Sequence, residues 1–215
     1  MAQAPDSEPA RPGAPRYSRK QAPERKRLLI EASVACLAEG GIAGFIVERI
    51  CKKAGISKGL ISHHFDGKED LLAQTYEAMT ANLDALSADQ LSRKDIAPRE
   101  ALRVFVESNF DPSVFDRSQL KAWLAVWGET TRNPKLAAIH KERYVLYHAR
   151  LVRLIGAVAG EDGRQVDPEL LATVLVSLID GLWLEWCLDE HLLPRERALS
   201  AIYHVLEPQL GPLQA

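Results

Sequence analysis

A short polar stretch at residues 57–64 holds the side chains best suited to bind a ligand. Lys58 supplies an ammonium that can reach a phosphate or a base edge, and Gly59 lets another backbone approach closely. The N-terminus of a helix beginning here would add partial positive charge and unpaired N–H groups. This chemistry is that of contact with nucleic acid. The residues expected to line a DNA groove are Ser57, Lys58, Gly59, Ser62, His63 and His64.

Metal chemistry is a weaker interpretation of the same residues. His63 and His64 are adjacent, and neighbours on a helix point about 100° apart, so they make a poor ligand pair. Cys36, Cys51 and Cys187 are odd in number and lack metal-ligand spacing. We expect three reduced, mostly buried thiols, no metal and no cofactor.

The elements that position the polar stretch lie in residues 46–65, IVERICKKAGISKGLISHHF. Apolar residues recur at helical spacing up to Ala54, Gly55 can end that helix, and Ser57 can cap a second short helix. Leu60, Ile61 and Phe65 form the buried side of the second helix. Two short helices around a tight turn predict a helix-turn-helix, and the alternative is an ordinary helical hairpin. Further cations expected to attract DNA backbone are Lys52, Lys53 and Lys68.

The longer string AGISKGLISHHFDGKEDLL resembles the signature of the TetR family of transcriptional regulators. Its ISHHF ending is similar to the BetI branch, and the resemblance covers residues 24–75. Ile46 departs from the pattern, because the family places Thr or Ser there, where a hydroxyl caps the helix and often contacts a phosphate. The resemblance implies a homodimer that binds a palindromic operator, and an effector pocket in the second domain that in BetI-like members answers to choline.

The distribution of charge agrees with a nucleic-acid partner, although the net charge is −2. Residues 1–70 hold twelve Lys/Arg against nine Asp/Glu, whereas the remainder holds fifteen against twenty. Phosphate affinity depends on the local basic surface rather than on the total. No apolar run approaches the ~18–20 residues that span a bilayer, and no secretion signal begins the chain, so we expect a cytoplasmic protein without a membrane partner.

Helical periodicity and the absence of alternating strands predict an all-α fold with about nine helices. Residues 1–22 are predicted to be a disordered basic, Pro-rich tail; whether this tail reaches DNA stays open, with Arg25 to Arg27 better placed to do so. Residues 23–67 would form the DNA-binding domain and residues 68–215 an effector-binding and dimerisation domain. In the second domain we expect one helix beginning at residue 68, helices over residues 98–109, 119–131, 134–159 and 170–188, and a last helix beginning at residue 194.

Aromatic and acidic residues concentrate in the second domain. A quaternary ammonium binds well to aromatic faces with a nearby carboxylate, so the set predicts a pocket for a small cationic or amphipathic effector, choline being one candidate. The alternative is that these aromatics are ordinary core. The candidate effector-binding residues are Trp123, Trp127, Glu129, Tyr144, Tyr147, His148, Asp180 and Trp183.

The last two helices carry more apolar surface than one small domain needs, which indicates a second, dimerisation surface. A dimer would present two reading helices about one DNA turn apart. The alternative is a monomer that uses these residues as core. The candidate dimerisation residues are Leu171, Val174, Leu175, Leu178, Ile202 and Leu206.

These features together predict a ligand-responsive DNA-binding regulator. Release from DNA by the effector would make it a repressor, while activation stays open. The alternatives are a helical protein-interaction module and a small-molecule enzyme. No phosphate loop, G-x-S-x-G or H-E-x-x-H motif supports the enzyme.

Overall fold

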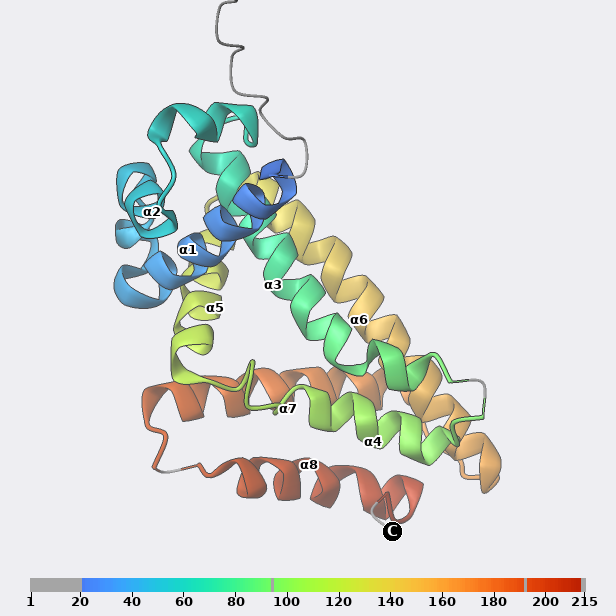
Figure 1. The fold of residues 1–215 in the computed structure, drawn as a ribbon. Coiled ribbons are helices and arrows are strands. Elements are labelled where there is room, and N and C mark those ends of the chain that lie inside the picture. Colours follow the sequence, from blue (N-terminus) through green and yellow to red (C-terminus); the bar gives the residue numbers. More distant parts are fainter. Residues whose placement is uncertain (1–20, 94, 192, 214–215) are drawn as a thin grey trace, which may run out of the picture.

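The computed structural model describes residues 21–213, apart from 94 and 192. Within these residues every regular element is a helix, eight α-helices and one 3₁₀ helix, which confirms the all-α prediction. Figure 1 shows a small helical unit above a larger body, with the long helices α3 (Lys68–Leu91) and α6 (Pro134–Glu161) running down from it. The predicted tail lies outside the described residues, except that residues 21 and 22 already belong to the first helix.

The small unit is built from α1 (Gln21–Gly44), α2 (Val47–Ala54) and the 3₁₀ helix η1 (Lys58–His63). Gly41 leaves helical geometry with φ 57°, and Gly55 ends α2 with φ 67°, conformations that glycine adopts without a Cβ clash. The cap prediction for Ser57 is wrong, since its side chain makes no cap hydrogen bond. The six-residue element is held by tight i to i+3 bonds, as short helices often are.

The larger body holds α3 (Lys68–Leu91), α4 (Pro98–Ser108), α5 (Arg117–Thr130), α6 (Pro134–Glu161), α7 (Pro168–Leu188) and α8 (Arg195–Leu210). Asn133 and Asp167 cap α6 and α7 by accepting backbone N–H bonds, and each directly precedes the proline that begins its helix. Asp116 does the same for α5, a cap that starts this helix two residues before the predicted boundary at 119.

Helices α1, α3 and α5 connect the small unit to the body, and α1 contacts both α3 and α5. Helix α1 packs along α5, and α3 continues directly from the small unit and lies beside α6. At the upper end of that pair, Lys135 Nζ lies 3.0 Å from Asp70 Oδ1. Asp70 also accepts hydrogen bonds from the Asp66 backbone and from Gln74, so this carboxylate ties the start of α3 to the start of α6.

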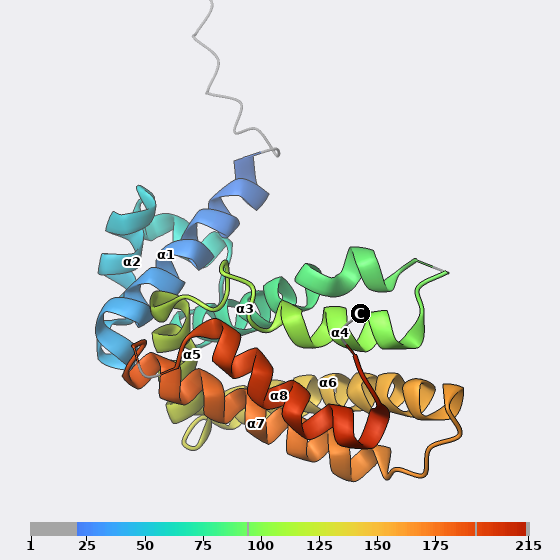
Figure 2. The same ribbon diagram turned by 90° about the horizontal axis from the view of Figure 1, so that it is seen from below.

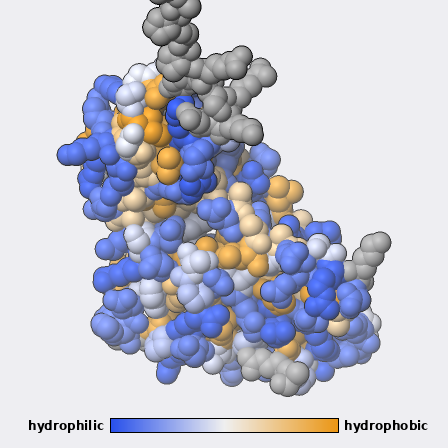
Figure 3. All heavy atoms as spheres, viewed as in Figure 1, coloured by the Kyte–Doolittle hydropathy of each residue, from blue (hydrophilic) through white to orange (hydrophobic). Residues whose placement is uncertain are grey.

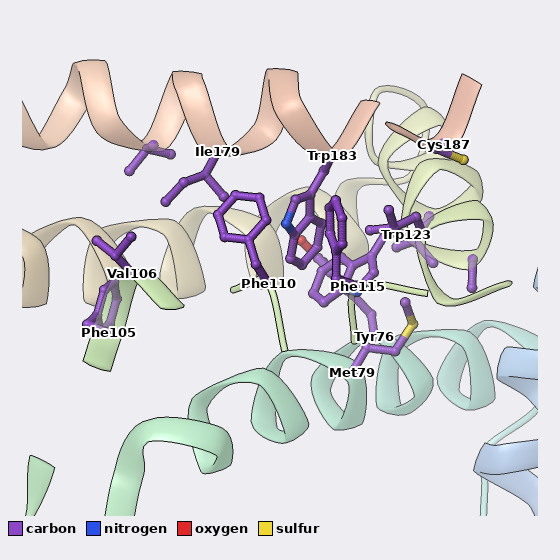
Figure 4. Close-up of a cluster of buried hydrophobic side chains, with 14 of the residues drawn as sticks. Tyr76, Met79, Phe105, Val106, Phe110, Phe115, Trp123, Ile179, Trp183 and Cys187 are labelled. Atoms are coloured by element: carbon purple, nitrogen blue, oxygen red, sulfur yellow. The ribbon is translucent and has the colours of Figure 1, made fainter. Parts of the chain in front are cut away.

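Aromatic side chains from several helices fill the centre of the body. Figure 4 shows Tyr76 of α3, Trp123 of α5 and Trp183 of α7 converging, with Phe110 and Phe115 beside them. Trp123 lies 5.7 Å from Tyr76 and 5.9 Å from Trp183 between ring centroids, both edge-on. Such pairs contribute about 0.5–1.5 kcal/mol each beyond the area they bury. Burial of these rings joins α3 to α5 and α7.

Helix α7 contradicts the expectation that no apolar run approaches the length needed to span a bilayer. It has 21 residues and is long and apolar enough, by length and composition alone, to cross a membrane. A core helix meets the same criterion, and one side of α7 packs against α5, α6 and α8. Figure 2 shows α7 and α8 lying beside each other along one side of the body. The side chains of α7 that are buried in the core are Leu171, Ala172, Leu175, Val176, Ile179, Trp183 and Cys187.

Candidate functional site

The polar residues predicted to meet DNA lie together on the surface of the small unit. Ile50 and Cys51 of α2, with Ile61 and Phe65, are buried beneath them and hold η1 against α2. His64 is half-buried, and burial followed by the neighbouring positive charges lowers its pKa. The residues left exposed are Lys52, Lys53, Ser57, Lys58, Gly59, Ser62, His63 and Lys68.

Internal carboxylates already neutralise part of this surface. Lys58 forms an ion pair with Glu48, which lowers the pKa of Glu48 and raises that of Lys58. Glu39 accepts from Lys53 at 2.7 Å and from Arg49 at 2.5 Å. Within the described part of the chain, Lys52 and Lys68 have no ion pair of this kind. Two lysines are therefore free for phosphate, and Lys58 must leave Glu48 to reach it.

The start of α1 lies beside this surface. Arg27 pairs with Glu24 at 2.6 Å and also with Glu31, and the Lys26 ammonium lies 5.9 Å from the centroid of the Phe65 ring. Arg27 is therefore engaged within its own helix, whereas Lys26 stands next to the polar surface. The expected contact from residues 1–20 lies outside the described residues.

A cavity of about 370 Å³ opens in the body between α3, α5, α6 and α7. Six of the eight predicted effector residues line it: Trp123, Trp127, Tyr144, Tyr147, Asp180 and Trp183. The structure does not bring Glu129 and His148 to this cavity. Glu129 pairs with Arg132 at 3.2 Å, and His148 contacts the Thr173 hydroxyl at 3.0 Å on the other side of Tyr144.

The aromatic rings differ in how much surface they offer to the cavity. Trp123 and Trp183 are only 6% and 3% exposed, so they mainly support the other cavity residues from behind and offer little surface to a ligand. Trp127 is half-buried and Tyr144 is 40% exposed, so these two offer more of their faces. The Trp183 indole N–H donates to the Asn109 carbonyl at 3.0 Å, which leaves the ring fixed and its own donor satisfied.

Asp180 is the acidic group that faces this aromatic wall. Its carboxylate is reachable through the cavity, and within the described residues it has no hydrogen bond or ion pair. The protein around it raises its pKa to about 6, because a charged carboxylate is poorly solvated there. A cation placed beside this carboxylate would stabilise its charged form and would itself be bound.

Sequence reasoning missed several polar residues of the cavity. Tyr76 Oη lies 2.8 Å from His140 Nδ1, and burial raises the pKa of Tyr76 to about 12 and lowers that of His140. No local signal pairs these residues, which are 64 positions apart. The cavity also takes in Asp84 and three arginines: Arg143, Arg150 and Arg153.

The predicted dimerisation residues need correction. Leu171, Leu175, Ile202 and Leu206 are buried in the protomer's own core, so they cannot form a contact surface. A helix apolar on nearly every side does not reveal which side faces inward. The residues on the outward side of α7 follow one another at intervals of 4, 3, 4, 3 and 4 and are all exposed. This outer stripe consists of Leu170, Val174, Ser177, Gly181, Leu184 and Leu188. Of the predicted set, Val174 lies on this outer stripe and Leu178 is half-buried.

Comparison with known proteins agrees with both regions. Residues 29–75 match the family described as bacterial regulatory proteins, tetR family, and residues 98–211 match the BetI-type transcriptional repressor C-terminal domain. The chain belongs to the TetR family of transcriptional regulators. Within that family its C-terminal domain is of the BetI type, which confirms the resemblance seen in the sequence.

Relatives cover nearly the whole chain. The transcriptional regulator BetI of Pectobacterium carotovorum is 33% identical over 87% of this chain and 95% of its own length. A putative transcriptional regulator from Pseudomonas aeruginosa superposes with a TM-score of 0.79 and 36% identity, covering 90% and 94% of the two chains. A regulator from Saccharomonospora viridis, solved in complex with choline, shares the fold with a TM-score of 0.76 at 24% identity over 86% and 96% of the two chains.

As a TetR-family member the chain is a DNA-binding transcriptional regulator with a ligand-binding C-terminal domain. The small unit of α1, α2 and η1 lies within the matched DNA-binding region. The aromatic cavity lies between α3 and the helices of the matched C-terminal domain. Its relatives are regulators rather than enzymes.

Proposed function

We propose that this regulator represses transcription from a palindromic operator and is released by a small quaternary ammonium compound such as choline. The observation that carries the proposal is Asp180, an unpaired carboxylate that faces a wall of tryptophan and tyrosine in one cavity. Aromatic faces and a carboxylate attract a cation that cannot donate conventional hydrogen bonds. The choline complex of the regulator from Saccharomonospora viridis, which shares this fold, supports the same ligand class.

DNA contact is assigned to the exposed surface of η1 and its neighbours. Lys58 and Lys68 are proposed to bind phosphates or a base edge, and Lys52 and Lys53 to add attraction for the backbone. Ser57, Ser62, His63 and His64 would face the groove, with Gly59 allowing a close approach. The exposure of these residues and the apolar support beneath them favour this assignment.

Two helices connect the cavity to the DNA-binding surface. Tyr76 of α3 lines the cavity two turns after Lys68, and α5 carries Trp123 and Trp127 while packing along α1. A ligand that binds one arrangement of these helices better than another would change the distance between the two DNA-binding surfaces of the dimer. The contact of α1 with α5 gives a second route beside the one through α3.

The outer stripe of α7 is proposed to pair two copies of the chain. Its 4-3 spacing is that of a packed helical seam, and the small Ser177 and Gly181 at its middle would let two such helices approach closely. Leu170 and Leu188 at the ends are 62% and 63% exposed in the single chain. We propose a homodimer that binds two half-sites in this way, and we propose that it acts in the cytoplasm.

The test is binding of the purified protein to DNA from upstream of its own gene, followed by fluorescence anisotropy. We expect tight, salt-dependent binding that weakens at least about tenfold at saturating choline, because the ligand can shift the equilibrium only by its differential affinity. Choline should be recovered unchanged, which separates a sensor from an enzyme. Binding that is indifferent to every quaternary ammonium compound would contradict the effector assignment and leave the DNA assignment intact.

A further inference from the structure

The effector cavity contains more positive than negative side chains, which a simple cationic ligand does not explain. Arg143, Arg150 and Arg153 line it together with Asp84 and Asp180. Arg150 and Asp84 form an ion pair at 3.4 Å, so they largely neutralise each other. Two arginines remain against the single carboxylate of Asp180.

The opposite charges do not meet inside the protein. None of the three arginines forms an ion pair with Asp180 in the described part of the chain, and Arg143 and Arg153 have no ion pair there at all. Arg150 lies over the Phe105 ring at 5.9 Å and is held in place by it. Cations and a carboxylate that share one cavity without pairing leave room for a molecule between them.

Helix α6 sets the order of these groups along the cavity. Tyr147, Arg150 and Arg153 follow each other at three-residue spacing on the side of α6 that faces it. With a rise of about 1.5 Å per residue, Arg150 lies roughly 4.5 Å and Arg153 roughly 9 Å along the axis from Tyr147. The charge of Asp180 acts on both Tyr147 and Tyr76, so this carboxylate lies near the aromatic end.

Two of the three arginines also border a second hollow. Arg150 and Arg153 also line a hollow bounded by the end of α3, the start of α4 and α6, whose other walls include Leu91, Ile96 and Leu154. Arg150 and Arg153 thus stand on the side away from the tryptophans, whereas Arg143 is the neighbour of Tyr144 in the sequence. Guanidinium groups in such a place bind carboxylates, sulfates and phosphates in a fork of N–H donors.

We infer that the natural effector is a zwitterion, a quaternary ammonium joined by a short linker to an oxyanion. The ammonium lies against Trp127, Tyr144 and Asp180, and the oxyanion is held by Arg153 with Arg150. The inference rests on the proposed function, because it assigns the second half of the same ligand. It goes beyond choline, whose hydroxyl carries no charge to match the arginines.

The experiment titrates the full-length protein with three probes at pH 7.5 and follows tryptophan fluorescence and calorimetric heat. The probes are choline, glycine betaine and phosphocholine, which share the trimethylammonium and differ in the second group. We expect at least one zwitterion to bind about tenfold or more tightly than choline, since one charge-assisted contact contributes about that factor. Inorganic phosphate alone should bind far more weakly than phosphocholine.

Two variants separate the arginine contact from a general effect of charge. In Arg153→Ala the preference for the zwitterion should shrink to about threefold or less while choline affinity stays unchanged. Lys141→Ala removes a cation from the same helix outside the cavity and should keep the full preference. Circular dichroism of both variants checks that each is folded.

The outcomes distinguish this inference from the proposed function. If choline binds as tightly as both zwitterions, or if Arg153→Ala keeps the preference, the zwitterion inference is overturned while a cationic effector stands. If none of the three probes binds, both the effector assignment and the inference fail.

Discussion

The DNA-binding surface and the effector cavity are assembled in opposite ways. The surface comes from one continuous stretch, residues 46–68, whose side chains are displayed on two short helices above a small core. The cavity takes its walls from helices that lie far apart in the sequence, with Tyr76 of α3 bonded to His140 of α6. A local motif can therefore be moved as a unit, whereas the cavity changes shape whenever its helices shift. This difference is what lets a ligand control a reader that it never touches.

The largest effect should come from separating the two copies of the chain. Val174→Glu with Leu188→Glu places charges on the outer stripe of α7, where like charges meet across a two-fold interface. We expect a monomer by light scattering and at least about a hundredfold loss of operator affinity, because one half-site replaces two. Ligand affinity should change little, since neither Val174 nor Leu188 lines the cavity. A variant that stays dimeric would show that the copies pair elsewhere.

Removing two cations from the DNA-binding surface around η1 should have the next largest effect. Lys58→Ala with Lys68→Ala is expected to weaken operator binding about ten- to a hundredfold and to lower the salt slope by about four, because the dimer loses four lysines. Choline binding should be unaltered, because neither lysine approaches the cavity. Lys121→Ala, an exposed lysine on α5, is the matched control and should leave DNA binding unchanged. Unchanged affinity in the double variant would mean that another surface meets DNA.

The acidity of Asp180 gives ligand binding in the cavity a pH dependence. With its pKa raised to about 6, the carboxyl is charged at pH 7.5 and mostly neutral at pH 5. Affinity for choline should therefore fall about tenfold over that range, and Asp180→Asn should be weak at both pH values. His140 also gains charge at low pH, so His140→Gln is the control and should retain most of the dependence.

The same group affects stability with a definite sign. The pKa of Asp180 is higher in the folded protein than its ordinary value of 3.8, so its contribution to the free energy of unfolding is present below about pH 4 and lost as pH rises through about 6. Asp180→Asn should therefore raise the melting temperature of the ligand-free protein at pH 7.5 and change it little at pH 4. A lower melting temperature at pH 7.5 would indicate an unrecognised favourable contact of the carboxylate.

The smallest effect concerns the acid that faces Lys58. Glu48→Gln removes its ion-pair partner and frees the ammonium for phosphate. We expect operator affinity to rise about two- to fivefold at low salt, with no change in ligand affinity. Glu31→Gln alters an acid that pairs only within α1 and serves as the comparison. An unchanged or weaker affinity would place Lys58 away from the phosphates.

Local chemistry explains why much of the fold could be predicted. Gly55, Asn133 and Asp167 determine helix ends through their own backbone or cap geometry, and the structure has these ends where the sequence placed them. The start of α5 was missed because Asp116 is not followed by a proline, which marks the other two caps. Periodicity and caps thus describe the helices without their mutual arrangement.

The site was predictable only where it is local. The reader follows from one motif, and six cavity residues follow from the clustering of aromatic and acidic side chains in the second domain. Tyr76, Asp84 and the arginines were missed because their meeting depends on how α3 lies beside α6. Which leucines of α7 face outward was equally hidden, since Leu170 and Leu171 are alike in sequence and opposite in burial.

The carboxylates on the small unit have a further consequence for how the protein searches a chromosome. Figure 3 shows hydrophilic side chains over much of the visible face, and on the small unit Glu39 and Glu48 occupy Arg49, Lys53 and Lys58. These acids serve as built-in counterions, so random duplex attracts the protein less strongly than its number of lysines would imply. Fewer molecules are then held at the vast excess of irrelevant sites, and a modest number of copies per cell suffices to fill the operator.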